Sequence, residues 1–243
     1  MNGPVKDYVC LDLETSGLYP RLDKIIEIGA VKVLGGVAAE HFQTFVNPGR
    51  KLSGHASEIT GITDRDLESV PYIEEALPEF LVFAGELPLL GHSVLFDYSF
   101  MKKAAVNQGL TFERTGVDTL KLARKFLPEL ESKNLGFLCR HFGISHTAHR
   151  ALGDALATQR LYEVLCGLFL EGNEKDFAPQ PLIYRVKKEG PASSAQKERL
   201  YKLTAAHKLE LDADIEKMTK NEASRTIDKI LAQYGKIPEK EKF

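Results

Sequence analysis

The sequence predicts an α/β fold, in which a mixed β-sheet is flanked by helices and followed by a small α-helical module. The prediction depends on the order of two periodicities. Strand-like alternation dominates residues 8–46, whereas later segments have apolar residues three and four positions apart and enclose one short strand-like run. Beyond Pro179 and Pro181, two more helical patterns follow without a strand pattern.

Three strands are expected to open the sheet as an antiparallel meander. The first, 8–14, ends at a Thr-Ser-Gly turn, and the third, 41–46, is closed by Asn-Pro-Gly. The second, 25–34, is followed by Gly35-Gly36, a sequence typical of a two-residue hairpin turn. Because a further short strand at 87–91 then alternates with helices, parallel strands covered by helices should complete the sheet.

Amphipathic spacing predicts the helices of the α/β part. They are expected at 72–83, 97–108, 118–126, 135–142 and 150–170. Asp64 is a candidate cap for a helix in the helical region before Phe83. In the tail, helices are expected at 195–207 and 219–234, and the second opens with a threonine and a glutamate at capping-box spacing.

The chain is expected to divide into an α/β domain at 1–178, a linker at 179–194 and a helical module at 195–243. Residues 1–179 carry 18 basic and 24 acidic side chains, whereas residues 180–243 carry 14 and 10, which gives net charges of −6 and +4 within the total of −2. An acidic body with a mildly basic tail fits a cation-binding site joined to a segment that touches phosphate. Ordinary variation of surface charge fits it equally well.

Composition excludes several classes of protein. Hydrophobic residues at 43% and charged residues at 27% are typical of a globular chain. The three cysteines are scattered and form no CxxC pair, which argues against a disulfide framework and against a thiolate metal site. Because the sequence shows neither a signal peptide nor an apolar run of about 18–20 residues, we expect a cytoplasmic protein without membrane contact.

Two carboxylates, Asp12 and Glu14, stand two residues apart on the first predicted strand and therefore project from one face. An exposed strand end would explain them without any function, but the flanking Val9, Leu11 and Leu13 favour a central strand. Neighbouring buried carboxylates repel each other, and a bound cation would turn that repulsion into attraction. Oxygen-only ligands suit Mg²⁺ or Mn²⁺.

Three more polar residues lie at predicted element starts. Asp97 follows the short strand and opens a helix, where the helix dipole alone would favour an acid. Asp154 lies on a helix among Ala151, Gly153 and Ala155, which indicates a closely packed face, although a solvated position is the simpler interpretation. His149 precedes the first turn of that helix, where loops more often carry a surface histidine than a catalytic one.

The segments DLETSGL, GHSVLFD and HRALGD occur in this order, and together they resemble the three exonuclease motifs of the DEDDh exonucleases. This group includes the proofreading subunit of the bacterial replicative polymerase. IIEIGAVKV, ITGIT and VDTLKLARKFLP support the resemblance, which covers about residues 6–170. It implies a ribonuclease H-like fold and 3′–5′ exonuclease activity. Ser93 stands where the family often has asparagine, at a position that is not a metal ligand in the family pattern.

The resemblance implies a role for each matching residue. Asp12, Glu14, Asp97 and Asp154 would hold two divalent cations, Mg²⁺ or Mn²⁺, with Asp12 bridging them, and His149 would be the general base. Paired cations can neutralise charge on the phosphoryl oxygens and stabilise the leaving 3′ oxygen. Histidine suits the base because its ordinary pKa lies near neutral pH.

Substrate contacts can be suggested beside the motifs. By analogy with the family, the backbone N–H of Thr15 would face the terminal nucleotide. Leu18, Ile62 and Phe96 are expected to pack against the terminal base or ribose, and the alternative for each is an ordinary place in the core.

Several functional alternatives remain open at the level of sequence. The same chemistry would act on RNA ends or short oligonucleotides, since the motifs do not distinguish DNA from RNA. A non-catalytic polymerase subunit, or a two-metal phosphatase or nucleotidyl transferase, is a further alternative. The tail could bind phosphates, which would favour DNA; it could equally present a solvated charged face or dock on a polymerase. The basic residues considered for these contacts are Lys197, Arg199, Lys202, Lys217, Lys220, Arg225 and Lys229.

Overall fold

The computed structural model describes residues 4–146 and 149–237 and divides the chain into two compact units. The first unit comprises the chain up to Pro48 together with Leu52–Val186. The second comprises Gly49–Lys51 and the chain from Lys187 onward. Within the described residues, no helix is both long enough and apolar enough to cross a bilayer.

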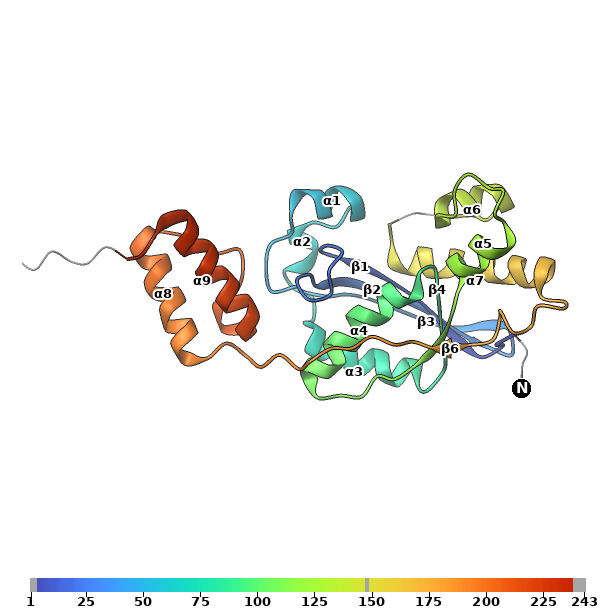
Figure 1. The fold of residues 1–243 in the computed structure, drawn as a ribbon, viewed down its shortest axis with the longest axis horizontal. Helices are drawn as coiled ribbons and strands as arrows, with labels where there is room; N and C mark the ends of the chain where they lie inside the picture. The colour runs from blue at the N-terminus through green and yellow to red at the C-terminus, as the bar shows by residue number, and fades with distance from the viewer. Residues whose placement is uncertain (1–3, 147–148, 238–243) are drawn as a thin grey trace, which may run out of the picture. The chain divides into compact units, whose positions relative to one another are not determined.

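Within the described residues, a six-stranded mixed sheet forms the centre of the first unit, with the strand order β3-β2-β1-β4-β5-β6. Figure 1 draws the strands as arrows. Strands β1, β2 and β3 form an antiparallel meander, β4 and β5 extend the sheet in parallel beside β1, and β6 returns antiparallel to β5. The mixed sheet predicted from the sequence is confirmed. The strands are β1 (Tyr8–Thr15), β2 (Ile25–Leu34), β3 (Val37–Phe45), β4 (Leu89–Gly91), β5 (Thr115–Asp118) and β6 (Gln180–Pro181).

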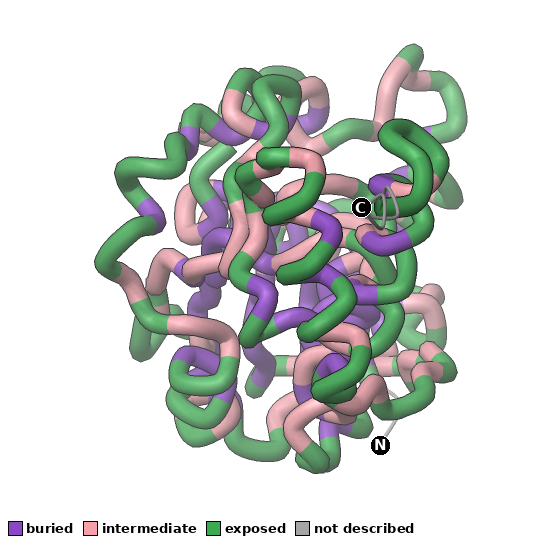
Figure 2. The backbone as a smooth tube through the Cα atoms, turned by 90° about the vertical axis from the view of Figure 1, so that its left-hand side faces the viewer, coloured by how far each residue is buried: buried purple, intermediate pink, exposed green. Residues whose placement is uncertain are grey.

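In the part of the first unit that the structure describes, seven helices accompany the sheet. They are α1 (Gly54–Thr60), α2 (Asp64–Leu67), α3 (Ile73–Ala84), α4 (Val94–Gln108), α5 (Thr119–Phe126), α6 (Leu135–Phe142) and α7 (Ala151–Phe169). Helices α3 and α4 pack on one face of the sheet, and α5, α6 and α7 pack on the other. Figure 2 colours the buried residues purple, and those of the strands and the packed helix faces form the core.

The alternation of β1 decides which face receives the acids. Val9, Leu11 and Leu13 are buried against α3 and α4, whereas Tyr8 and Cys10 are buried in the core that includes α7. Because successive side chains of a strand point to opposite faces, the even-numbered acids of β1 lie on the same face as Tyr8 and Cys10. The two carboxylates therefore face the layer that contains α7.

The hairpin between β2 and β3 matches the sequence prediction. Gly35 and Gly36 form a two-residue connection with φ of +60° and +84°. Two consecutive positive φ values characterise the type I′ hairpin turn, and glycine adopts them without a steric cost.

Three expectations for local structure differ from the structure. Thr63 rather than Asp64 is the N-cap of α2, and it forms a capping box with Asp66. Strand β5 was not expected because it has only four residues, including Gly116, whose Cβ would meet Leu182 at 2.9 Å. Residues 180–181, expected in a linker, pair with β5, and the first unit extends to Val186.

Gly29 allows α7 to approach β2 very closely. A Cβ at this position would lie 2.1 Å from the backbone of both Ala151 and Leu152, at the start of α7. We expect Gly29→Ala to push this first turn away from the sheet and to lower the free energy of unfolding by about 1–3 kcal/mol or more. Urea unfolding measures the loss. Gly54→Ala is the matched control, since nothing lies within 4 Å of a Cβ at Gly54, and an equal loss in both variants would contradict the explanation.

The second unit is a small helical module with its own apolar core. It contains α8 (Ser194–His207), the 3₁₀ helix η1 (Ile215–Lys217) and α9 (Lys220–Tyr234). Thr219 and Glu222 form the capping box expected from the sequence. The core side chains are Ala192, Leu200, Leu203, Ile215, Met218, Ala223, Ile227 and Ile230.

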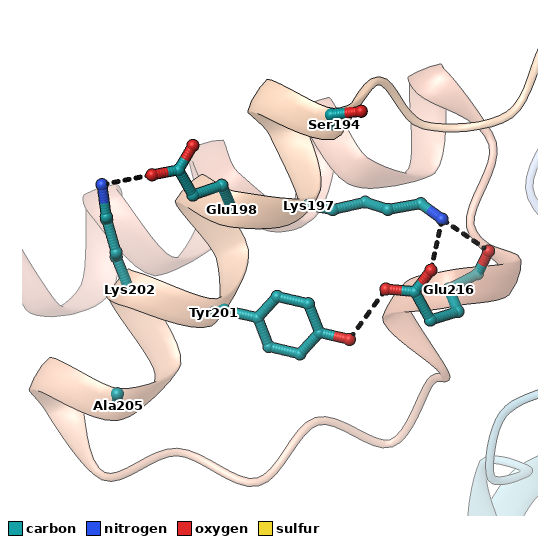
Figure 3. A pocket seen from close by; sticks show the side chains of 7 residues that line it. All are labelled: Ser194, Lys197, Glu198, Tyr201, Lys202, Ala205 and Glu216. Atoms are coloured by element: carbon teal, nitrogen blue, oxygen red, sulfur yellow. Dashed lines mark hydrogen bonds and ion pairs between the residues drawn. The ribbon is translucent and has the colours of Figure 1, made fainter.

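Acidic neighbours already neutralise some of the cations of this module. Lys197 pairs with Glu216 at 2.6 Å, and Lys202 pairs with Glu198 at 2.6 Å, beside a surface pocket (Figure 3). The Tyr201 hydroxyl also donates to Glu216, at 2.9 Å. The pocket wall is therefore nearly neutral, which does not favour phosphate binding there.

Candidate active site

Three of the expected acids converge between β1 and α7. Asp12 and Glu14 come from β1 and Asp154 from the first turn of α7, and each offers a carboxylate oxygen within 4.8 Å of the other two. Glu14 and Asp154 are each 8% exposed, and Asp12 is partly buried. The strand and helix were expected from separate sequence patterns, and their packing across the sheet face brings the acids together.

Asp97 lies next to this group but is held differently. It occupies the first turn of α4, is 4% exposed, and accepts a hydrogen bond from the backbone N–H of Leu13 at 3.0 Å. Because Leu13 separates Asp12 from Glu14 in β1, the bond places the Asp97 carboxylate beside the pair. Its charge contributes to the raised pKa of Asp12.

The carboxyl groups resist ionisation in one another's presence. Burial first, and then the charges of Asp154 and Glu27, raise the pKa of Glu14 to about 8. Burial also raises the pKa of both Asp12 and Asp97 well above 3.8, and for Asp12 the charges of Asp97, Asp154 and Glu14 add to the effect. Such a cluster of oxygen donors fits a hard divalent cation, whose charge would reverse these shifts.

The pKa of Glu14 predicts how the stability of the metal-free protein depends on pH. The ordinary pKa of a glutamate is 4.5, so between this value and about 8 the folded protein holds a proton that the unfolded chain has lost. The contribution of Glu14 to the free energy of unfolding is then largest below pH 4.5, and it is lost as the pH rises through 8. In EDTA, we expect the melting temperature to drop from about pH 5 to pH 8.5, and to drop less in Glu14→Gln.

Mn²⁺ at pH 8.5 should restore the lost stability, since a ligand that binds only the folded state stabilises it. Differential scanning fluorimetry across this pH range measures the effect. A melting temperature in EDTA that rises through pH 8 would contradict the electrostatic account.

Two histidines approach Asp154 in different ways. His149 lies just before α7 with φ of +64°, and its backbone N–H donates to Asp154 Oδ2 at 3.0 Å, while the residue as a whole is exposed. His146, which the sequence analysis did not single out, places its Nε2 against Asp154 Oδ1. The sequence signal for His146 was its position three residues before His149, in the same connection.

Glu27 is a second residue that the sequence analysis missed. It is fully buried on β2, directly opposite Glu14 in the register with β1, and pairs with Arg150 at 3.0 Å. This contact raises the pKa of Arg150. The sequence signal for Glu27 was the presence of an acid inside the apolar run IIEIGAV, because a buried charge requires a partner.

The four suggested substrate contacts occupy different environments. Thr15 ends β1 and its hydroxyl donates to the Gly17 carbonyl at 2.7 Å, and Leu18 is 73% exposed. Ile62 is 2% exposed and packs with Ile26 and Leu67. Its side chain therefore lies in the core, which was the alternative to a contact with substrate. Phe96 packs against Phe100, with ring centroids 5.0 Å apart.

The backbone conformation at Ser93 decides which residues suit this position of the second motif. It adopts the left-handed conformation, with φ of +75°, and its N–H donates to Asp118 at 3.0 Å. Asparagine visits this conformation more readily than serine does. The frequent asparagine of the resembling family therefore fits the turn that leads into α4.

The fold and the acidic group together define the class: a mixed-sheet α/β enzyme with an oxygen-donor site suited to divalent metal. The exonuclease family RNase_T matches residues 9–162. The chain belongs to this family of nucleic-acid hydrolases, and its fold is ribonuclease H-like.

Curated relatives agree with the family. The chain is 38% identical over 157 residues to the DNA polymerase III subunit epsilon of Aquifex aeolicus, covering 64% of this chain and 78% of that protein. It is 40% identical over 156 residues to the PolC-type DNA polymerase III of Clostridium perfringens. That match covers 64% of this chain but only 11% of the polymerase, so the chain spans a small part of these larger relatives.

Solved structures share the fold of the first unit. Exonuclease I aligns with a TM-score of 0.62 at 20% identity, over 71% of this chain and 43% of that one. Exonuclease X in complex with 5′ overhanging duplex DNA aligns with a TM-score of 0.55 at 24% identity, over 70% of this chain and 99% of that one.

Proposed function

We propose that this protein is a 3′–5′ exonuclease that removes nucleoside monophosphates from DNA ends with the help of two divalent cations, Mg²⁺ or Mn²⁺. The observation that carries the proposal is the convergence of the Asp12, Glu14 and Asp154 carboxylates within 4.8 Å, on a fold whose family consists of exonucleases. Asp97, held beside them by Leu13, would complete the set of metal ligands.

Each residue would have a distinct task in hydrolysis. Bound cations would neutralise the phosphoryl oxygens and stabilise the leaving 3′ oxygen. The charges of the other three acids all contribute to the raised pKa of Asp12, which gives Asp12 the central position for bridging two cations. His149, exposed at the start of α7, can reach a water outside the acidic group and accept its proton.

DNA is the preferred substrate of this proposal. The relatives are named as DNA polymerase III proteins, and exonuclease X was solved with duplex DNA. An exoribonuclease acting on RNA ends is the alternative, since the acids do not discriminate the sugar. A terminal nucleotide would lie against Thr15 and the exposed Leu18.

We propose that the first unit is the catalytic domain and that the helical module serves binding. Among the basic side chains on α8 and α9, Arg199, Lys220, Arg225 and Lys229 have no ion pair within the described part of the chain, and they are the candidates for phosphate contact. Association with a DNA polymerase in the cytoplasm, as part of proofreading, is the partner role that the names of the relatives support.

A 5′-labelled single-stranded DNA and a matching RNA test the proposal directly. With Mg²⁺ or Mn²⁺ we expect a ladder of products that shorten from the 3′ end, with DNA degraded faster. EDTA and the Asp12→Ala variant are the controls, and both should abolish the ladder. Faster degradation of RNA would select the alternative substrate, and cleavage of neither strand would overturn the enzymatic proposal.

A further inference from the structure

Glu27 is a buried carboxylate with an unusually complete set of donors. Its side chain is fully buried in β2, directly opposite Glu14 in the register with β1. It accepts from Arg150 Nη2 at 3.0 Å and Nε at 3.3 Å, from the Ala151 backbone N–H at 3.3 Å, and from Gln43 Nε2 at 2.7 Å. A buried charge is retained without a large penalty only when it is hydrogen-bonded in this way.

Two of the donor residues, Arg150 and Ala151, stand at the start of α7. Its N-cap residue is Arg150, whose side chain makes no capping hydrogen bond to the helix. The first N–H groups of a helix have no partner within the helix, and a side-chain acceptor usually satisfies one of them. Here the acceptor comes from the sheet, because Glu27 binds the N–H of Ala151, the first helical residue.

The same first turn carries the residues assigned to catalysis. Asp154 lies in it, and His149 precedes it, joined to Asp154 through its backbone N–H. Gly29, two residues after Glu27 on β2, lets this turn lie against the strand. Strand β2 therefore fixes both the height of α7 above the sheet, through Gly29, and the position of its first residue, through Glu27.

We propose that Glu27 is a positioning residue: together with Arg150 it anchors the first turn of α7 and so sets Asp154 and His149 relative to Asp12 and Glu14. This inference rests on the proposed function for its catalytic consequence. The positioning of the acids by Glu27 can be tested without nuclease activity, since it also predicts how tightly the acids bind a metal ion.

A double-mutant cycle on the whole chain tests the anchor. The variants are Glu27→Gln, Arg150→Gln and the double variant, and Arg150→Lys is added to keep the charge without the forked guanidinium. Mn²⁺ affinity is measured by calorimetry, and kcat and KM are measured on single-stranded DNA. A matched control cycle uses Lys32 and Glu40, an ion pair of 2.9 Å that joins β2 to β3 away from α7.

We expect each single substitution to weaken Mn²⁺ binding and to lower kcat by about 10–100-fold, as the loss of an outer partner of metal ligands does. KM for DNA should stay within about twofold. The double variant should be no worse than the worse single one, because both substitutions break one anchor. Arg150→Lys should recover part of the loss, and the control cycle should change neither quantity.

The outcomes distinguish a positioning role of Glu27 from a purely stabilising one, and they test that role separately from the proposed function. If melting temperatures in EDTA fall while Mn²⁺ affinity and kcat stay within about twofold of the unmodified protein, Glu27 is only structural and the inference is wrong. If the unmodified protein has no nuclease activity, the proposed function fails, and Mn²⁺ affinity still decides the anchor. Should Glu27→Gln not fold, the half-exposed Arg150 provides the variants that decide it.

Discussion

Asp12→Asn should abolish hydrolysis and, at the same time, stabilise the metal-free protein. The substitution removes the acid that interacts with all the other carboxylates of the site. We expect kcat to fall by more than about 10³-fold, since removing a single electrostatic group from an active site already lowers kcat by about 10²–10³-fold. In EDTA the effect reverses. A neutral amide removes both the cost of burying a charge and the repulsion that together raise the pKa of Asp12, so the variant should melt at a higher temperature above neutral pH.

Single-turnover cleavage with Mn²⁺ and fluorimetric melting in EDTA measure the two effects on the same preparation. Asp228→Asn, at an exposed position of α9, is the control and should alter neither. Opposite signs for activity and stability are the signature of a site built for a cation. A variant that keeps a tenth of the activity, or melts lower in EDTA, would contradict that assignment.

His149→Gln should slow the chemistry by about 10²–10⁴-fold while leaving Mn²⁺ affinity unchanged. The reason is that the proposed role of His149 is to accept a proton from water, whereas its contact with Asp154 is made by the backbone N–H, which the substitution retains. The loss should appear in kcat and not in KM for DNA.

His146→Gln is the matched comparison, because the His146 imidazole contacts Asp154 directly. We expect a much smaller loss of kcat from it, with Mn²⁺ bound at least as tightly once the competing contact is gone. Steady-state kinetics and calorimetry on both variants provide the comparison. A larger loss of kcat in His146→Gln than in His149→Gln would assign the proton acceptor to His146.

Local pattern was sufficient to predict most elements, whereas the grouping of the acids was implied by the resemblance of the three motifs to the DEDDh exonucleases. The two-residue alternation of β1 puts Asp12 and Glu14 on one face, and the small residues around Asp154 mark the face of α7 that packs there. The Gly35-Gly36 turn likewise fixes the β2–β3 hairpin by its own chemistry. Each of these features depends on a few adjacent residues.

Features that depend on distant partners could not be predicted in this way. Glu27 pairs with Arg150, which lies more than a hundred residues away in the sequence. Strand β6 is only two residues long, and it is defined by its pairing with β5. The contact of His146 with Asp154 depends on the path of the connection before α7. Asp64 was an equally good cap in sequence terms, but it instead accepts the N–H of Leu52.

We propose that the acidic group hydrolyses strands only from an end. A single reaction containing linear and circular single-stranded DNA of the same sequence, with Mn²⁺, tests it most directly. We expect the linear strand to be converted to nucleoside monophosphates while the circle persists, and EDTA should protect both. Cleavage of the circle at a rate comparable to the linear strand, or survival of both in the presence of metal, would contradict the claim.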